Sequence, residues 1–102
     1  MLKLTVLYGH PSDPAAFETY YAETHLPLVA KIPGVPRSEK ARVVGTPDGS
    51  KPPYYRIFEF WFDSQEQMQA CLGSPEGQAA VADLPNFATG GVTILISEVQ
   101  QG

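Results

Sequence analysis

Few side chains in this sequence can transfer a proton near neutral pH, and the first of them is His25. An unperturbed imidazole titrates near pH 6.5, and His25 stands two positions before Pro27 in the stretch TYYAETHLPLVAKIPG. Pro27 cannot donate a backbone hydrogen bond to the carbonyl of Glu23, so a helix should open or bend at this turn. The freed carbonyl could accept a bond from the imidazole or hold a water. His25 is therefore a candidate acid–base group, and the alternative is a packed core histidine.

Glu59 is the second candidate for acid–base chemistry. It lies in YYRIFEFWF, residues 54–62, which is aromatic, β-branched and free of proline, as expected of a strand. Its three phenylalanines share one face, which is the natural floor for helices, so the other face carries Tyr55, Ile57, Glu59 and Trp61. A carboxylate that is buried there needs a partner or a raised pKa. Catalysis by Glu59 and simple pairing with a polar side chain of a neighbouring strand are both open.

Aromatic side chains near these two candidates predict the wall of a ligand pocket. Tyr21 and Tyr55 offer hydroxyl groups that can donate hydrogen bonds, Trp61 offers a flat surface, and Leu28 lies on the same helical stripe as His25. We interpret these four residues as ligand contacts. The alternative is that they only pack.

Other kinds of site lack their motifs. Two histidines fifteen positions apart, with no paired cysteines, make a poor metal site. The sequence has no phosphate-binding glycine loop, dinucleotide fingerprint or serine nucleophile elbow. We therefore expect neither a metal nor a cofactor.

Charge and cysteine content indicate the environment and the partners. The formal net charge of −4 disfavours nucleic acid and anionic membrane surfaces, and no window approaches the 18 to 20 apolar residues of a membrane span. The single cysteine, Cys71, cannot form an intrachain disulfide, which fits a reducing compartment. We expect a soluble cytoplasmic protein.

Apolar periodicity and turn residues predict one domain over residues 1–102 in the order β-α-β-β-α-β. The first helix carries the stripe Phe17, Tyr20, Tyr21, Thr24 and Leu28. This order is typical of the ferredoxin-like α+β fold, a four-stranded antiparallel sheet with both helical segments on one face. The polar second strand should lie at an edge, and the first and third at the centre. The expected strands are 2–8, 37–46, 54–62 and 92–99; the expected helices run from Pro14 to Lys31, from Asp63 or Ser64 to Gly73, and from Ser74 to Pro85.

The sheet face without helices predicts a homodimer. That face is still largely apolar, and no further helix remains in the sequence to cover it. Two sheets packed face to face around a two-fold axis would bury it. Such an interior suits a small-molecule pocket, and a dry interface is the alternative.

The segment YGHPSDPAAFETYYAETHLPLVAKIPG, with FEFWFDS and SPEGQAAVADLPNF further on, resembles the EthD family of the dimeric α+β barrel superfamily. The resemblance covers essentially the whole chain. It implies the same fold, a homodimer with a cleft in each half, and an acid–base role for the histidine at position 25. It also implies kinship with cofactor-free isomerases, monooxygenases, dehydratases and decarboxylases, and with proteins that are labelled reductases or that accompany an ether-degrading oxygenase.

The leading hypothesis is that a small apolar, cyclic compound binds between the first helix and the sheet. His25 would move a proton, with Glu59 or a tyrosine hydroxyl as its orienting partner. An oxidoreductase-associated catabolic activity is one form of this hypothesis. The alternatives are a non-catalytic ligand-binding or accessory protein of an oxygenase system, and a dimeric fold in which His25 is structural.

Overall fold

One antiparallel sheet forms the base of the molecule. A computed structural model describes residues 1–102, with strands β1 (Leu2–Tyr8), β2 (Arg37–Arg42), β3 (Arg56–Phe62) and β4 (Val92–Glu98). Their order across the sheet is β2-β3-β1-β4, and every neighbouring pair is antiparallel. The predicted placement is confirmed: β1 and β3 are central, and the polar β2 lies at an edge.

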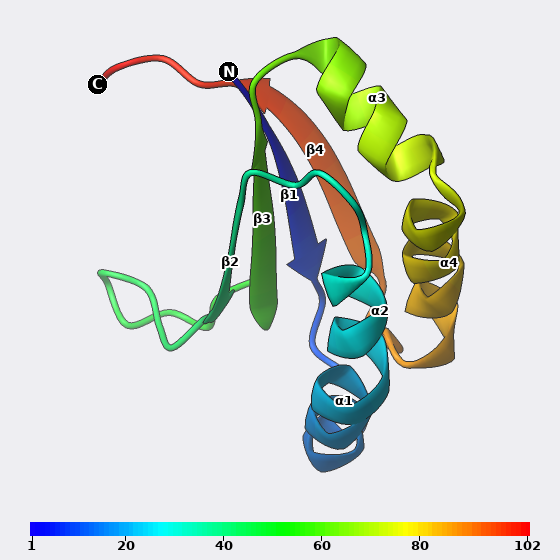
Figure 1. Cartoon of the computed structure of the whole chain (residues 1–102). Coiled ribbons are helices and arrows are strands. Elements are labelled where there is room, and N and C mark those ends of the chain that lie inside the picture. The colour runs from blue at the N-terminus through cyan, green and yellow to red at the C-terminus, as the bar shows by residue number, and fades with distance from the viewer.

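The helical segments cover one face of this sheet (Figure 1). The first segment consists of α1 (Pro14–Tyr20), the π-helical turn η1 (Tyr21–His25) and α2 (Leu26–Ala30). The second consists of α3 (Gln65–Gly73), α4 (Pro75–Asp83) and the 3₁₀ turn η2 (Leu84–Asn86). The chain therefore has the predicted ferredoxin-like β-α-β-β-α-β arrangement. None of these helices has the length and apolar character required to cross a membrane.

Three capping side chains fix where helices begin. Asp13, Ser64 and Ser74 each accept a hydrogen bond from the backbone amide three residues later, at 3.0 to 3.1 Å. Such bonds satisfy amides that have no partner within the helix. Pro14 and Pro75 follow two of the caps, at positions where a missing amide has no consequence. These starts agree with the sequence pattern.

The core lies between the helices and the sheet. β1 contributes Leu4, Val6 and Tyr8, and all three phenylalanines of β3 are buried beside them. The predicted floor for the helices is therefore confirmed. The helical layer adds Phe17, Tyr21, Met68, Cys71, Ala80, Leu84 and Phe87.

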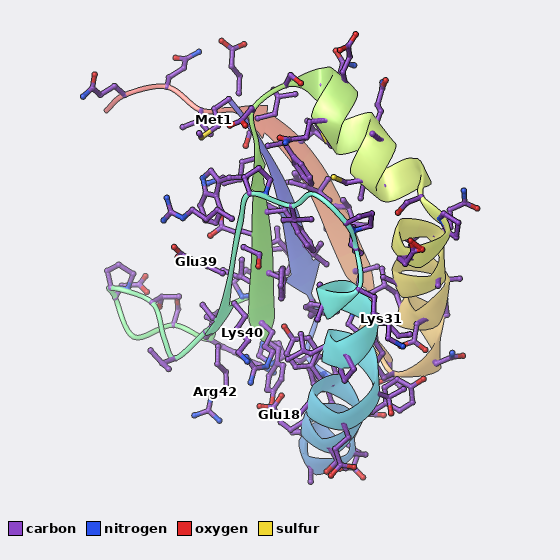
Figure 2. The ribbon with its side chains drawn as sticks, viewed as in Figure 1. Met1, Glu18, Lys31, Glu39, Lys40 and Arg42 are labelled. Carbon is purple, nitrogen blue, oxygen red and sulfur yellow. The ribbon has the colours of Figure 1, made fainter.

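The opposite sheet face has no helix over it. The β1–β3 register places Lys3, Ile57, Glu59 and Trp61 on this face, where they are half-buried within the chain. Leu95 of β4 shares the face and is 51% exposed. At the edge, Glu39 projects from β2 away from the helices (Figure 2). We call this surface the open face.

Tyr55 does not belong to the open face, so its predicted placement is wrong. β3 begins at Arg56, and the chain bends at Tyr55 just before it. Strict alternation of side chains therefore does not extend to this residue. Its ring packs against Phe17 of α1 instead, with the ring centroids 5.2 Å apart and the planes near perpendicular.

β2 is also shorter than the sequence pattern indicates, because it ends at Arg42. The Val43 amide still bonds to the Tyr55 carbonyl. Beyond it, hydrogen bonds among Thr46, Asp48 and Ser50 close a compact turn that takes the chain out of the sheet. The prediction that this strand extends to residue 46 is therefore wrong, and short polar side chains of this kind favour turns over strands.

Candidate functional site

A wide helical turn positions His25. The Leu26 amide donates to the carbonyl of Tyr21, five residues earlier, which is the π-helical pattern. Pro27, which lacks an amide, follows at once. The predicted opening of the helix is therefore present, in the turn just before the proline.

The wide turn keeps a four-residue repeat on one face. In an α-helix four residues rotate the chain by about 400°, so side chains spaced by four drift about 40° at each step. A turn with an extra residue offsets this drift, and Phe17, Tyr21 and His25 are all buried. Thr24, which ordinary helical spacing assigns to the same stripe, is exposed instead. The π-helical turn is thus the local feature that directs His25 into the core.

His25 is paired with Asp83, the last residue of α4. The His25 Nδ1 lies 3.0 Å from the Asp83 Oδ2, and both side chains are buried. An ionised carboxylate only accepts hydrogen bonds, so Nδ1 carries the shared proton. In the neutral imidazole, Nε2 then has a free lone pair. Nε2 has no protein partner in the structure.

Asp83 is held by two further donors. The Tyr20 hydroxyl donates to Oδ1 at 2.6 Å, and the Asn86 amide donates to the same oxygen at 3.0 Å. A carboxylate at the C-terminus of a helix faces the negative end of the helix dipole, which is unfavourable. The three hydrogen bonds offset this unfavourable interaction, and they hold both carboxylate oxygens in place.

The two pKa shifts give the pair a defined charge state. Burial lowers the pKa of His25 below its ordinary value of 6.5, and the opposing effect of Asp83 is smaller. Burial raises the pKa of Asp83, but hydrogen bonds from Tyr20, Asn86 and His25 outweigh it and bring this pKa below its usual value. At neutral pH the site therefore contains a neutral imidazole oriented by a carboxylate.

Aromatic rings enclose the imidazole. The ring of Phe87 lies 4.6 Å from that of His25, and Tyr21 stacks beside it at 6.1 Å. The Tyr21 hydroxyl is buried without a hydrogen-bond partner, and burial raises the pKa of Tyr21 to about 12. The Arg56 guanidinium lies 4.8 Å from the Tyr21 ring and is paired with Glu18 of α1. A buried donor without a partner in the protein is unusual in folded proteins.

A small cavity adjoins His25 between the helices and the sheet. Its volume is about 40 Å³, which is room for only a few waters. Of its fourteen lining residues, only His25 and Tyr8 carry polar side-chain groups. Val81 and Ile94 line it while remaining 48% and 43% exposed, so its mouth lies between α4 and β4.

The structure does not bring Glu59 to His25. Glu59 lies on the open face, across the sheet from the cavity, and its carboxylate pairs with the Lys3 ammonium at 2.9 Å. This is the pairing with a neighbouring strand that the sequence left as an alternative. The orienting partner of His25 is Asp83 instead.

Among the expected ligand contacts, only Tyr21 lies next to His25. Trp61 is on the open face, with the Arg37 guanidinium 4.3 Å from its ring centroid. Leu28 lines a shallow hollow with Pro75 and Ala79 on the outer side of α2 and α4. Tyr55 packs on Phe17, outside the cavity wall.

Sequence reasoning missed Asp83 and Tyr8. Asp83 lies three residues after Ala80 on the buried side of α4, at a helix end where a carboxylate is unfavourable. That combination was a usable signal. Tyr8 has the buried parity of β1, with Leu4 and Val6, and its strand pattern alone marks it as core. No three His, Cys, Asp or Glu side chains gather closely enough to hold a metal ion.

These observations define a ferredoxin-like α+β protein with a buried histidine–carboxylate pair under its first helical segment. Comparison with known proteins identifies the family. The model of the EthD domain matches residues 10–91. The chain therefore belongs to the EthD family.

Two relatives match over nearly their whole length. An uncharacterised 11.0 kDa protein from the thcB–thcC intergenic region of Rhodococcus erythropolis is 42% identical, over 96% of this chain and 94% of that protein. The crystal structure of an EthD family protein from Bacillus halodurans C-125 is 37% identical, with a TM-score of 0.90, and covers 98% of this chain and 99% of that one.

More distant structures share the fold alone. A dimeric ferredoxin-like protein of unknown function from Thermobifida fusca is 14% identical, with a TM-score of 0.71, over 96% of this chain and 90% of that one. SnoaB from Streptomyces nogalater, a cofactor-independent oxygenase, is 17% identical, with a TM-score of 0.65, over 99% of this chain and 93% of that one. Structural neighbours of this chain are thus dimeric in at least one case.

Proposed function

We propose that this protein moves a proton on a small apolar, cyclic compound, without a cofactor, using His25 as the base. The observation that carries the proposal is the 3.0 Å bond between the His25 Nδ1 and the Asp83 Oδ2. It leaves the Nε2 lone pair free on an imidazole that lines the cavity. A base needs a fixed tautomer, an accessible lone pair and a neutral form at working pH.

The proton transfer balances without an oxidant or reductant. Nε2 takes a proton from a carbon beside a carbonyl group, and the electron pair of the broken C–H bond forms an enolate. The proton then returns from the imidazolium to the same carbon, or to another carbon of the extended enolate, which gives an isomer. During this step Asp83 stabilises the imidazolium through the same hydrogen bond.

Tyrosine hydroxyls are the candidates for stabilising the enolate oxygen. Tyr8 lines the cavity; Tyr21, whose hydroxyl is buried without a partner, stacks on His25 but is not part of the cavity wall. Burial raises the pKa of both phenols, so both remain donors at neutral pH. Donors aimed at developing negative charge are commonly the largest single contribution to catalysis.

Deuterium exchange tests the proposal without knowledge of the natural substrate. Cyclohexanone in D₂O exchanges its α-hydrogens slowly, and NMR can follow the exchange with and without protein. We expect wild-type protein to accelerate the exchange, and His25→Ala to reduce the acceleration by about 10²- to 10⁴-fold. Leu28→Ala, outside the cavity, is the control. Equal acceleration by wild type and His25→Ala would refute the role of His25.

The second candidate is a non-catalytic ligand-binding or accessory protein of an oxygenase system. The small volume of about 40 Å³ favours it, because a catalyst must have room for the reacting part of its substrate. Binding of a ketone at His25 with no acceleration of exchange would support this candidate over the first.

A further inference from the structure

A second hollow lies beside the His25 cavity along the sheet. It has a volume of about 250 Å³ between α3 and β4, and its lining residues are Leu2, Gln65, Met68, Gln69, Leu72 and Ile96. Leu72 lines both spaces. We call this hollow the α3–β4 groove.

The register of β1 and β4 shows that the groove and the cavity follow the same two strands. Leu4 and Ile94 line the cavity, and Leu2 and Ile96 line the groove one pleat further on. Two residues along a strand span about 7 Å. The two spaces are therefore neighbours along these strands, with Leu72 in both walls, and we call the two together the path.

The polarity of this path changes along its length. The inner end has the imidazole of His25 and the phenol of Tyr8, and apolar side chains line the rest of the cavity. In the groove the only polar lining side chains are two glutamine amides. Neither section has a charged side chain in its wall. A charged ligand would lose hydration here without gaining a counter-ion.

Two exposed apolar side chains of β4 line the cavity and the groove. Ile94 and Ile96 face the helical side of the sheet yet are 43% and 62% exposed. A ring fully enclosed at His25 would need about 150 Å³, judged from an engineered cavity that binds benzene. The inner section provides about 40 Å³. A ligand that places only its polar end inside and its bulk in the groove fits both sections.

We infer that the ligand is an elongated neutral molecule with one oxygen-bearing end between His25 and Tyr8 and an apolar body in the α3–β4 groove. This inference rests on the proposed function, since it takes His25 as the reacting end of the path. It adds the ligand's shape, its lack of charge and the groove that selects its length.

A homologous series of ketones tests the inference. Cyclohexanone, 4-ethylcyclohexanone and 4-butylcyclohexanone are titrated by calorimetry while NMR follows the His25 imidazole. We expect affinity to rise about fourfold for each methylene group that enters the groove. The anion 4-butylcyclohexanecarboxylate should leave the His25 signals unchanged.

Two variants test the apolar body and the oxygen-bearing end of the ligand separately. Ile96→Gln, at an exposed position in the groove wall, should remove most of the gain with chain length. Val44→Gln, on the β2–β3 loop at 90% exposure, is the matched control. Tyr8→Phe keeps the ring and removes the hydroxyl, and should weaken all three ketones by a similar factor, about two- to tenfold.

The outcomes distinguish this inference from the proposed function. If cyclohexanone shifts the His25 signals but longer ketones bind no better, the groove is not part of the site, and the proposed function stands. If the chain-length gain survives Ile96→Gln, the apolar body lies elsewhere, which also overturns the inference. If no ketone perturbs His25, the proposed function fails as well.

Discussion

The imidazole of His25 and the carboxylate of Asp83 are 58 positions apart in the sequence and meet inside the core, with Nδ1 and Oδ2 at 3.0 Å. The contact joins the first helical segment to the second on the sheet face that both segments cover. It connects two buried groups, one neutral and one charged, whose states depend on each other. Predictions about the site therefore concern the pair as a unit.

Replacing the carboxylate should weaken the base. In Asp83→Asn the side chain has the same shape but no charge, so the contribution that raises the pKa of His25 is lost. We expect the pKa of His25 to fall further below 6.5 and the ketone exchange rate to fall at least tenfold. An NMR titration of the imidazole measures the first effect. Tyr20→Phe removes one donor to Asp83 and should produce a smaller change in the same measurement.

Stability should decrease on mild acidification because His25 is buried as a neutral group. The pKa of His25 is near 6.5 in the unfolded chain and lower in the folded protein. Between these values the unfolded state binds more protons, so the free energy of unfolding rises with pH. The stabilisation is thus complete above about pH 6.5 and is lost as pH falls through the folded pKa.

Denaturant titrations from pH 7.5 to pH 5 measure this dependence. One proton limits its slope to about 1.4 kcal/mol per pH unit. His25→Gln should have a flatter profile over the same range, because the residue no longer titrates. Parallel profiles for the two proteins would show that His25 is not a buried neutral base.

The open face should hold two copies of the chain together. Ile57, Trp61 and Leu95 lie on it without cover from their own helices, and a structural neighbour of the same fold is dimeric. Light scattering at micromolar concentration should give twice the chain mass of 11.1 kDa. Leu95→Lys introduces an unpaired charge into the apolar interface and should give monomers.

Val44→Lys is the control for that experiment, because Val44 is 90% exposed on the β2–β3 loop. It should leave the mass unchanged. A monomeric wild-type protein would remove the argument from the open face.

Alternation along the strands predicted most of the fold. The phenylalanines of β3 and the parity of β1 are set by burial of one sheet face, which placed the helices. The order of the elements and the polarity of β2 placed the strands. The placement of Tyr55 on the open face was wrong because a bend at this residue, just before β3, interrupts the alternation.

The site was only half predictable. His25 was identified because an imidazole titrates near neutral pH and because Pro27, two positions on, changes local helix geometry, which is a short-range effect. Asp83 was not, because its pairing depends on how the second helical segment packs on the first. Glu59 was chosen on the correct premise that a carboxylate in a sheet needs a partner, but Lys3 on the adjacent strand supplies that partner. Strand pairing and helix packing at long sequence separation decide such contacts.

Pro27 should control the geometry of the pair through the wide turn. In Pro27→Ala the new amide can donate to the carbonyl of Glu23, which favours ordinary α-helical geometry over the π-helical turn. Narrowing this turn would rotate His25 toward solvent by roughly 40° and lengthen its bond to Asp83. We expect the pKa of His25 to move toward 6.5, because burial is the main cause of its depression, and ketone exchange to slow about tenfold or more. Helicity should not fall, since alanine is the better helix former.

Pro33→Ala, beyond the end of α2, is the matched control and should change neither the imidazole titration nor the exchange rate. An unchanged His25 pKa in Pro27→Ala would show that packing against Tyr21 and Phe87 alone holds the imidazole in place.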